Sequence, residues 1–295
     1  MNIYRGRFAP TPSGPLHFGS MVAAVGSYLD AKAHGGMWAV RIDDLDPPRV
    51  APGAADSILR CLEQFGLHWD GDIIYQSKRT EAYQAALQQL RGSGLVYACG
   101  CSRKEIGEAL SGGAAYPGTC RHGIAGRQVR AWRIRTGPTE ITFQDLLQGR
   151  ITQNLEREVG DFVLYRADHV FAYHLACAVD DNAQGITHVV RGADLMESTP
   201  RQIYLQRLMG LATPDYLHLP VALNAAGEKL SKQTLAAAIS AARAAHVLAD
   251  VLRFLQHPPP DEVGAEGVLA LLRWGIEHWD RKRLPVIAGA RYAGT

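Results

Sequence analysis

Residues 7–19 read RFAPTPSGPLHFG, and this stretch decides the fold through what lies on either side of it. Half of the residues from position 10 to 15 are proline, so this part forms neither a helix nor a strand. The residues before it, from Ile3 to Phe8, predict a short strand. After it, apolar side chains recur at helical spacing from Gly19 to His34, which predicts a helix. The proline-rich stretch is therefore a connection between a strand and a helix.

The elements that follow complete a βαβ unit. A glycine pair at 35–36 stops the helix, and residues 37–42 predict a second strand. This order predicts an α/β fold with a parallel sheet, and it places any ligand beyond the carboxyl end of the first strand. Similar patterns predict further helices over 54–65, 80–91, 173–180, 234–256 and 264–279, and further strands over 130–135, 140–143, 150–153, 161–165, 188–191 and 217–223.

The composition is that of a soluble globular protein. Of the 295 residues, 47% are apolar and 20% are charged, which excludes a disordered or a fibrous chain. No apolar run approaches the length of a membrane span, and residues 1–7 contain no signal-peptide core. We therefore expect a cytoplasmic protein that does not associate with a membrane. The net charge of +2 gives no global field for nucleic acid. Arginines at alternating positions within 127–135 are more typical of a solvated strand face than of a phosphate track.

The junction of the first strand and helix could bind a nucleotide. Backbone N–H groups and the helix dipole at such a junction hold phosphates. His17 can donate a hydrogen bond to an α-phosphate, and Gly19, lacking a Cβ, lets an adenine approach the start of the helix. Taken alone, the stretch is more typical of a plain connection with a structural histidine.

A second candidate lies far along the chain, where residues 229–233 read KLSKQ. A loop with two lysines, Lys229 and Lys232, can stabilise the leaving pyrophosphate of ATP. A solvated surface turn is the simpler interpretation of this segment on its own.

Together the two segments resemble the HIGH and KMSKS signatures of class I aminoacyl-tRNA synthetases, in the correct order. Between them, RIDDLDPPR at 41–49 and VRGADL at 190–195 resemble segments specific to the glutamyl branch of that family. The resemblance covers residues 3 to 240, and four ordered motifs are much harder to meet by accident than one. It implies a Rossmann-type catalytic domain.

The resemblance also implies roles for individual residues. The glutamate-binding residues would be Arg7, Ala9, Thr11, Asp43, Tyr173 and Arg191. The residues for ATP, which is used with Mg²⁺, would be His17, Gly19, Lys229 and Lys232. The chemistry agrees, because the two carboxylates of glutamate need guanidinium groups and its ammonium needs an acidic group.

The sequence departs from the family pattern at three positions. Asp43 stands where the family usually has Glu, so its carboxylate would lie about one methylene further from the ammonium. Ser20 replaces the second histidine of the helix signature, and Gln233 replaces the last serine of the lysine loop. Both of the latter variations occur in the glutamyl branch.

Three of the five cysteines predict a zinc site. Cys99, Cys101 and Cys120 have a spacing compatible with one tetrahedral Zn²⁺, although three free thiols are the alternative. Chemistry alone favours His122 as the fourth ligand, whereas the resemblance implies Tyr116. No nucleophile or base lies nearby in the sequence, so we expect a structural site.

Within the glutamyl branch, the chain resembles shortened paralogues that keep the catalytic half. The 39 residues after Gln256 are too few for a helical anticodon-binding domain. We expect four regions: the first half of the catalytic domain (1–95), a zinc-bearing insertion in the position of an acceptor-end domain (96–155), the second half (156–223), and the lysine loop with a short helical C-terminal appendix (224–295).

The resemblance implies a monomeric enzyme that forms glutamyl-adenylate and passes glutamate to queuosine, in the anticodon stem-loop of tRNA(Asp). One alternative is a minimal glutamyl-tRNA synthetase that charges a tRNA 3′ end. Another is a nonenzymatic tRNA-binding paralogue, against which the intact lysine loop argues.

Overall fold

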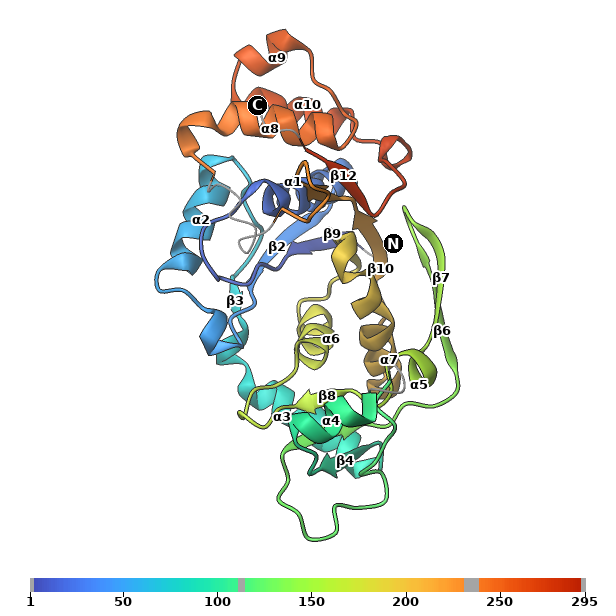
Figure 1. Cartoon of the computed structure of the whole chain (residues 1–295). Coiled ribbons are helices and arrows are strands. Elements are labelled where there is room, and N and C mark those ends of the chain that lie inside the picture. The colour runs from blue at the N-terminus through green and yellow to red at the C-terminus, as the bar shows by residue number, and fades with distance from the viewer. Residues whose placement is uncertain (1–2, 111–114, 231–238, 293–295) are drawn as a thin grey trace.

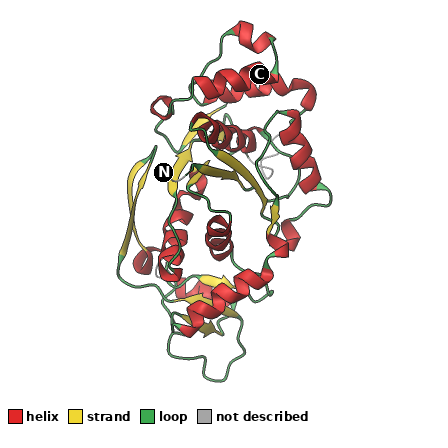
Figure 2. Cartoon of the chain, turned by 180° about the vertical axis from the view of Figure 1, so that it is seen from behind, coloured by secondary structure: helices red, strands yellow, loops and turns green. Residues whose placement is uncertain are grey.

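A parallel sheet lies between two smaller regions in the computed structural model, which describes residues 3–110, 115–230 and 239–292 (Figure 1). A small antiparallel sheet lies at one end of the molecule and a group of helices at the other. The view from behind in Figure 2 shows the same arrangement. None of the helices in these residue ranges has the length and hydrophobicity needed to cross a membrane.

The opening βαβ unit forms as the sequence predicts. Strand β1 (Arg5–Phe8) pairs in parallel with β2 (Met37–Ile42), and β2 pairs with the short β3 (Ile74–Tyr75). Helix α1 (Phe18–Ala33) connects the first two strands and is buried along most of its length. The α2 (Ala54–Gln64) and α3 (Thr80–Gly92) helices follow the predicted ranges closely.

A second sheet, in the order β7-β6-β10-β9, extends the first one. Its strands are β6 (Glu140–Asp145), β7 (Gly149–Asn154), β9 (His188–Gly192) and β10 (Asp215–Leu219). Strand β10 runs parallel to both β9 and β6, while β6 and β7 form an antiparallel hairpin. The N–H of Thr187 donates to the carbonyl of Arg5 at 2.9 Å, which joins β9 to β1. The predicted Rossmann-type parallel sheet is therefore confirmed.

Two helices of the second half lie side by side. Helix α6 (Tyr173–Ala183) was predicted, whereas α7 (Thr199–Met209) was not. Its start is marked by Pro200 in the first turn and its end by Gly210, which has a φ of 69°. These are recognisable signals that the apolar periodicity did not reveal.

The small antiparallel sheet consists of β4 (Val96–Cys99), β5 (Ala131–Ile134) and β8 (Val163–Tyr165), with α4 (Arg103–Leu110) nearby. Strand pairing runs across the predicted boundary between residues 155 and 156, where α5 (Leu155–Glu158) lies. Strand β8 follows that boundary and pairs with β5, while the β6–β7 hairpin precedes it and belongs to the sheet of β10.

The C-terminal region differs from the prediction of one helix over 234–256. Residues 234–238 lie outside the described residues, Ile239 and Ser240 are irregular, and helix α8 (Ala244–Phe254) begins later. The N–H of Ile239 bonds to the carbonyl of Leu16, so a tertiary contact overrides the helix propensity of the alanines here.

Two further predicted elements are each divided. The helix predicted over 264–279 is two helices, α9 (Asp261–Ala265) and α10 (Val268–Glu277), because Gly267 between them has a φ of 97°. The strand predicted over 217–223 is divided at Pro220, after which β11 (Val221–Leu223) pairs in parallel with β12 (Gly289–Arg291). Proline lacks the N–H that a continuous strand needs.

Candidate active site

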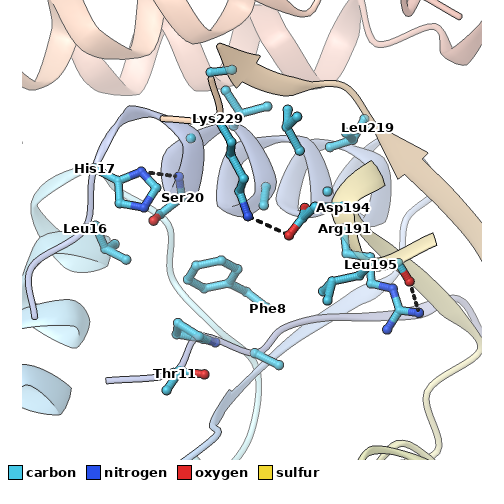
Figure 3. Close-up of a pocket in the computed structure, with 18 of the residues that line it drawn as sticks. Phe8, Thr11, Leu16, His17, Ser20, Arg191, Asp194, Leu195, Leu219 and Lys229 are labelled. Atoms are coloured by element: carbon cyan, nitrogen blue, oxygen red, sulfur yellow. Dashed lines mark hydrogen bonds and ion pairs between the residues drawn. The ribbon is translucent and has the colours of Figure 1, made fainter. Parts of the chain in front are cut away.

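A cavity of about 640 Å³ opens at the carboxyl ends of β1 and β9 (Figure 3). Its lining comes from the proline-rich connection and the start of α1, from the end of β9, and from β11 with the residues that follow it. This is the position that the βαβ order predicts for a ligand site. The cavity is large enough for an amino acid and a nucleotide.

His17 caps the N-terminus of α1 at the edge of this cavity. Its Nδ1 accepts a hydrogen bond from the N–H of Ser20 at 3.3 Å (Figure 3), so the proton of the neutral ring is on Nε2. The first turn of the helix contains no acidic residue that would compete for an anion. The helix N-terminus and the imidazole can therefore both donate to a phosphate.

The lysine loop reaches the same end of α1. A Cβ added to Gly19 would lie 3.2 Å from the carbonyl oxygen of Leu230, so any side chain here would crowd the loop. The N–H of Leu230 donates to the carbonyl of Ala222 at 2.7 Å, which ties the loop to β11. The Nζ of Lys229 lies 2.6 Å from Oδ2 of Asp194 and lines the cavity (Figure 3).

Arg191 supplies a buried cation at the other side of the cavity. Its side-chain Nη2 donates to Oγ1 of Thr199 at 2.8 Å, and its Nε donates to Nε2 of His218 at 3.2 Å. The remaining nitrogen, Nη1, is buried and has no hydrogen-bond partner. A buried guanidinium N–H without a partner is costly, and a carboxylate in the cavity would satisfy it.

Arg7 lines the cavity and belongs to a buried network of charges behind it. Oδ1 of Asp181 accepts from Nε of Arg7 at 3.3 Å and from Nη1 of Arg41 at 2.5 Å. Nε of Arg41 also donates to Oδ1 of Asp43 at 2.7 Å. Burial raises the pKa of the Asp43 carboxyl, although Arg41 and Arg7 oppose this shift. The network fixes Arg7 at the base of the cavity.

Tyr173, the first residue of α6, lines the cavity together with Arg7 and Arg191. Burial raises the pKa of the Tyr173 hydroxyl, so this group stays neutral and can donate a hydrogen bond. These three side chains offer hydrogen-bond donors and carry no negative charge, which suits a carboxylate ligand.

A second cluster lies in the small antiparallel sheet, where the Sγ atoms of Cys99, Cys101 and Cys120 are all within 4.8 Å of one another. The Oη of Tyr116 lies 3.5 Å from Sγ of Cys99 and 3.4 Å from Sγ of Cys101. All four residues are buried, whereas His122 is exposed. Three thiols and a phenol at these distances fit a tetrahedral metal site.

The family comes from sequence comparison. Residues 4–254 match the model for the catalytic domain of class I tRNA synthetases (E and Q). The chain belongs to the class I tRNA synthetases. It is therefore an enzyme, a ligase, whose class uses ATP, an amino acid and tRNA.

Curated relatives of this synthetase share its length and a common name. Glutamyl-Q tRNA(Asp) synthetase of Dechloromonas aromatica is 59% identical over 288 residues, which cover 96% of each chain. Proteins of the same name from Chromobacterium violaceum and Pseudomonas aeruginosa are 53% and 52% identical, with at least 95% of each chain covered. A glutamate tRNA ligase from Elizabethkingia meningosepticum has the same fold, with a TM-score of 0.81 at 24% identity; the match covers 99% of this chain and 67% of that one.

The structure of the synthetase brings most of the predicted site residues together. Those that line the one cavity are Arg7, Ala9, Thr11, His17, Gly19, Tyr173, Arg191 and Lys229. Asp43 is not among the lining residues, because its carboxylate faces Arg41 behind the cavity. Lys232 lies outside the described residues. Of the two candidates for a fourth metal ligand, Tyr116 faces the thiols.

Several residues around the synthetase site were missed. Asp194, which pairs with Lys229, lies within the VRGADL segment and could have been found there. Asp181 belongs to a pair of acidic residues near the end of a predicted helix, which is a detectable though ambiguous signal. His218 and Asp145 gave no signal, because they lie in short strands remote in sequence from every motif.

Proposed function

We propose that this synthetase activates glutamate with ATP and transfers the glutamyl group to queuosine in the anticodon of tRNA(Asp). The observation that carries the first step is the unpartnered, buried Nη1 of Arg191, a residue that lines a cavity whose opposite side is formed by the N-terminus of α1 and Lys229. The names of the full-length relatives support the choice of acceptor.

The proposed first step is an in-line displacement. Arg191, Arg7 and Tyr173 bind the side-chain carboxylate of glutamate, which leaves the α-carboxylate to attack the α-phosphorus of ATP. A bond forms between that carboxylate oxygen and phosphorus, and the bond to the pyrophosphate oxygen breaks. His17 and the N–H groups of α1 stabilise charge on the α-phosphate, and Lys229 stabilises the leaving pyrophosphate, whose Mg²⁺ enters with the nucleotide.

In the proposed second step, a hydroxyl oxygen of the queuosine cyclopentenediol attacks the carbonyl carbon of glutamyl-adenylate. An ester forms, AMP leaves, and the hydroxyl proton is released. The base would be bound by stacking and local backbone contacts, in keeping with the net charge of +2.

Labelled glutamate tests this function directly. We expect incorporation into tRNA from cells that make queuosine, and into an isolated queuosine-containing stem-loop, but not into tRNA from cells that lack the modification. Label that is released by removing the 3′-terminal adenosine would instead identify a minimal glutamyl-tRNA synthetase. Absence of glutamate-dependent ATP–pyrophosphate exchange, measured with and without tRNA, would identify a nonenzymatic tRNA-binding protein.

We also propose that Cys99, Cys101, Tyr116 and Cys120 hold one structural Zn²⁺. The three thiols and the phenol are buried together, and the site is remote from the cavity. Zinc at this position would stabilise the small sheet by linking β4 to the segment before β5.

Elemental analysis of protein purified without added metal should give about one zinc per chain. Cys120→Ser should lower the melting temperature while pyrophosphate exchange by the folded fraction stays within roughly twofold, since a structural metal supplies folding energy. Cys61→Ser is the matched control, because Cys61 lies outside the thiol cluster. Freshly prepared, reduced protein without metal would contradict the zinc proposal.

A further inference from the structure

Arg191 is held by the buried His218, which is held in turn by the buried Asp145, and the three residues lie near the ends of three adjacent strands. Arg191 lies near the carboxyl end of β9, His218 lies directly opposite it on β10, and Asp145 is the last residue of β6. All three are at least 96% buried, with exposed fractions of 4%, 0% and 1%. Their side chains form a line across the carboxyl ends of three parallel strands, directly behind the cavity.

The hydrogen bonds along this line have a fixed direction. The Nε of Arg191 can only donate, so Nε2 of His218, 3.2 Å away, must accept and cannot carry a proton. The ring proton is therefore on Nδ1, which donates to Oδ2 of Asp145 at 2.6 Å. Burial, with help from Arg191, lowers the pKa of His218 despite Asp145, so the ring stays neutral.

Asp145 is itself held in one orientation by the backbone. Its Oδ1 accepts from the N–H groups of Leu147, Gln148 and His218, at 3.0, 2.8 and 3.3 Å. Burial acts to raise the pKa of Asp145, but the bonds from His218 and from these N–H groups lower it overall. The carboxylate is therefore an ionised acceptor that cannot rotate away from the imidazole.

We propose that Asp145 and His218 are positioning residues that select the tautomer needed to aim Arg191 at the substrate carboxylate. The inference rests on the proposed role of Arg191 in binding glutamate. His218 Nε2 accepts from Nε of Arg191, and Oγ1 of Thr199 and the carbonyl of Leu195 accept from Nη2. The only guanidinium nitrogen left for a ligand is therefore Nη1, which has no partner in the protein. The relay thus determines which nitrogen of the guanidinium is left without a partner in the protein.

The substitution Asp145→Asn tests this relay with almost no change in shape. The backbone N–H groups of Leu147 and Gln148 should keep the amide oxygen at the Oδ1 position, so the amide NH₂ faces Nδ1 of His218. A donor there forces the ring proton onto Nε2, where it opposes the Nε–H of Arg191. We expect the affinity for glutamate, measured calorimetrically, to fall on the order of 10- to 100-fold. The KM for ATP and the kcat at saturating glutamate should change little.

Nitrogen NMR of histidine-labelled protein reads the tautomer independently. The protein has eleven histidines, so the His218 signals are assigned as those missing from His218→Gln. We expect a proton on Nδ1 in the wild type and on Nε2 in Asp145→Asn. A wild-type ring protonated on Nε2 would overturn the inference even if the variant failed to fold.

Asp30→Asn is the matched control for loss of a buried carboxylate. Asp30 is equally buried but accepts from Arg281 and Trp279 of the C-terminal region, remote from the cavity. The Asp30→Asn variant should bind glutamate with unchanged affinity. If the wild type and Asp145→Asn bound glutamate with equal affinity, the positioning role alone would be overturned. If the wild type bound no glutamate, the proposed function would be overturned, and this inference with it.

Discussion

Replacing Lys229 with alanine should slow glutamate-dependent ATP–pyrophosphate exchange by roughly two to three orders of magnitude, as loss of a charge contact to the leaving group does. Its ammonium lies at the cavity, 2.6 Å from Asp194, close to the N-terminus of α1 that would hold the α-phosphate. The KM for glutamate should change little, because the proposed glutamate ligands lie at Arg7 and Arg191.

Lys32→Ala is the matched control for this experiment. Lys32 forms an ion pair of nearly the same length with Asp70, at 2.7 Å, but neither residue lines the cavity. Its loss should leave exchange unchanged. If Lys229→Ala exchanged pyrophosphate at the wild-type rate, the proposed role of this lysine would be wrong.

Asp181→Asn should lower the free energy of unfolding by about 3–5 kcal/mol at neutral pH, because it leaves the buried guanidinium groups of Arg7 and Arg41 short of a counter-charge. Urea unfolding at pH 7 measures this change. Asp168→Asn is the control: Asp168 also pairs with an arginine, Arg166, but is exposed, so its loss should cost less than about 1 kcal/mol. Equal costs for the two variants would contradict the role given to the buried network.

The same carboxylate should make the protein sensitive to acid. Burial opposes ionisation of Asp181, but Arg7 and Arg41 together lower its pKa to about 2. Because the folded-state pKa is below the unfolded value of about 3.9, the stabilisation is complete above that value and is lost as the pH falls towards 2. A series of unfolding curves between pH 5 and 2 should therefore be flatter for Asp181→Asn than for the wild type.

Features formed by residues close together in the sequence could be predicted, whereas contacts between residues far apart in the sequence could not. Strand β2 was predicted at its observed bounds, and the first signature segment meets the described start of the second, Lys229 and Leu230, at one cavity, because local pattern and motif order carry that information. The pairing of Arg7 with Asp181 joins residues 174 positions apart and had no local signature. The same holds for the line from Asp145 through His218 to Arg191, which only strand order creates.

Tertiary contacts also explain the errors in secondary structure. Within the described part of the alanine-rich segment, the α-helix begins at Ala244, because Ile239 is tied to Leu16. Asp43 was expected at the glutamate from the resemblance and from the need of the ammonium for an acidic group, yet Arg41, two positions away, holds its carboxylate in the network behind the cavity. Neither helix propensity nor motif matching predicts which of several possible partners a side chain or backbone group will bind.

The pairing of β11 with β12 affects the order in which the site is completed during protein synthesis. Strand β11 carries the loop of Lys229, and its other edge pairs with residues 289–291, close to the end of the sequence. A chain leaves the ribosome with its N-terminus first. The elements β1, α1 and β9 therefore emerge well before β12, the strand that pairs with β11. A nascent chain therefore has the glutamate side of the cavity while the support for its phosphate side is still being translated.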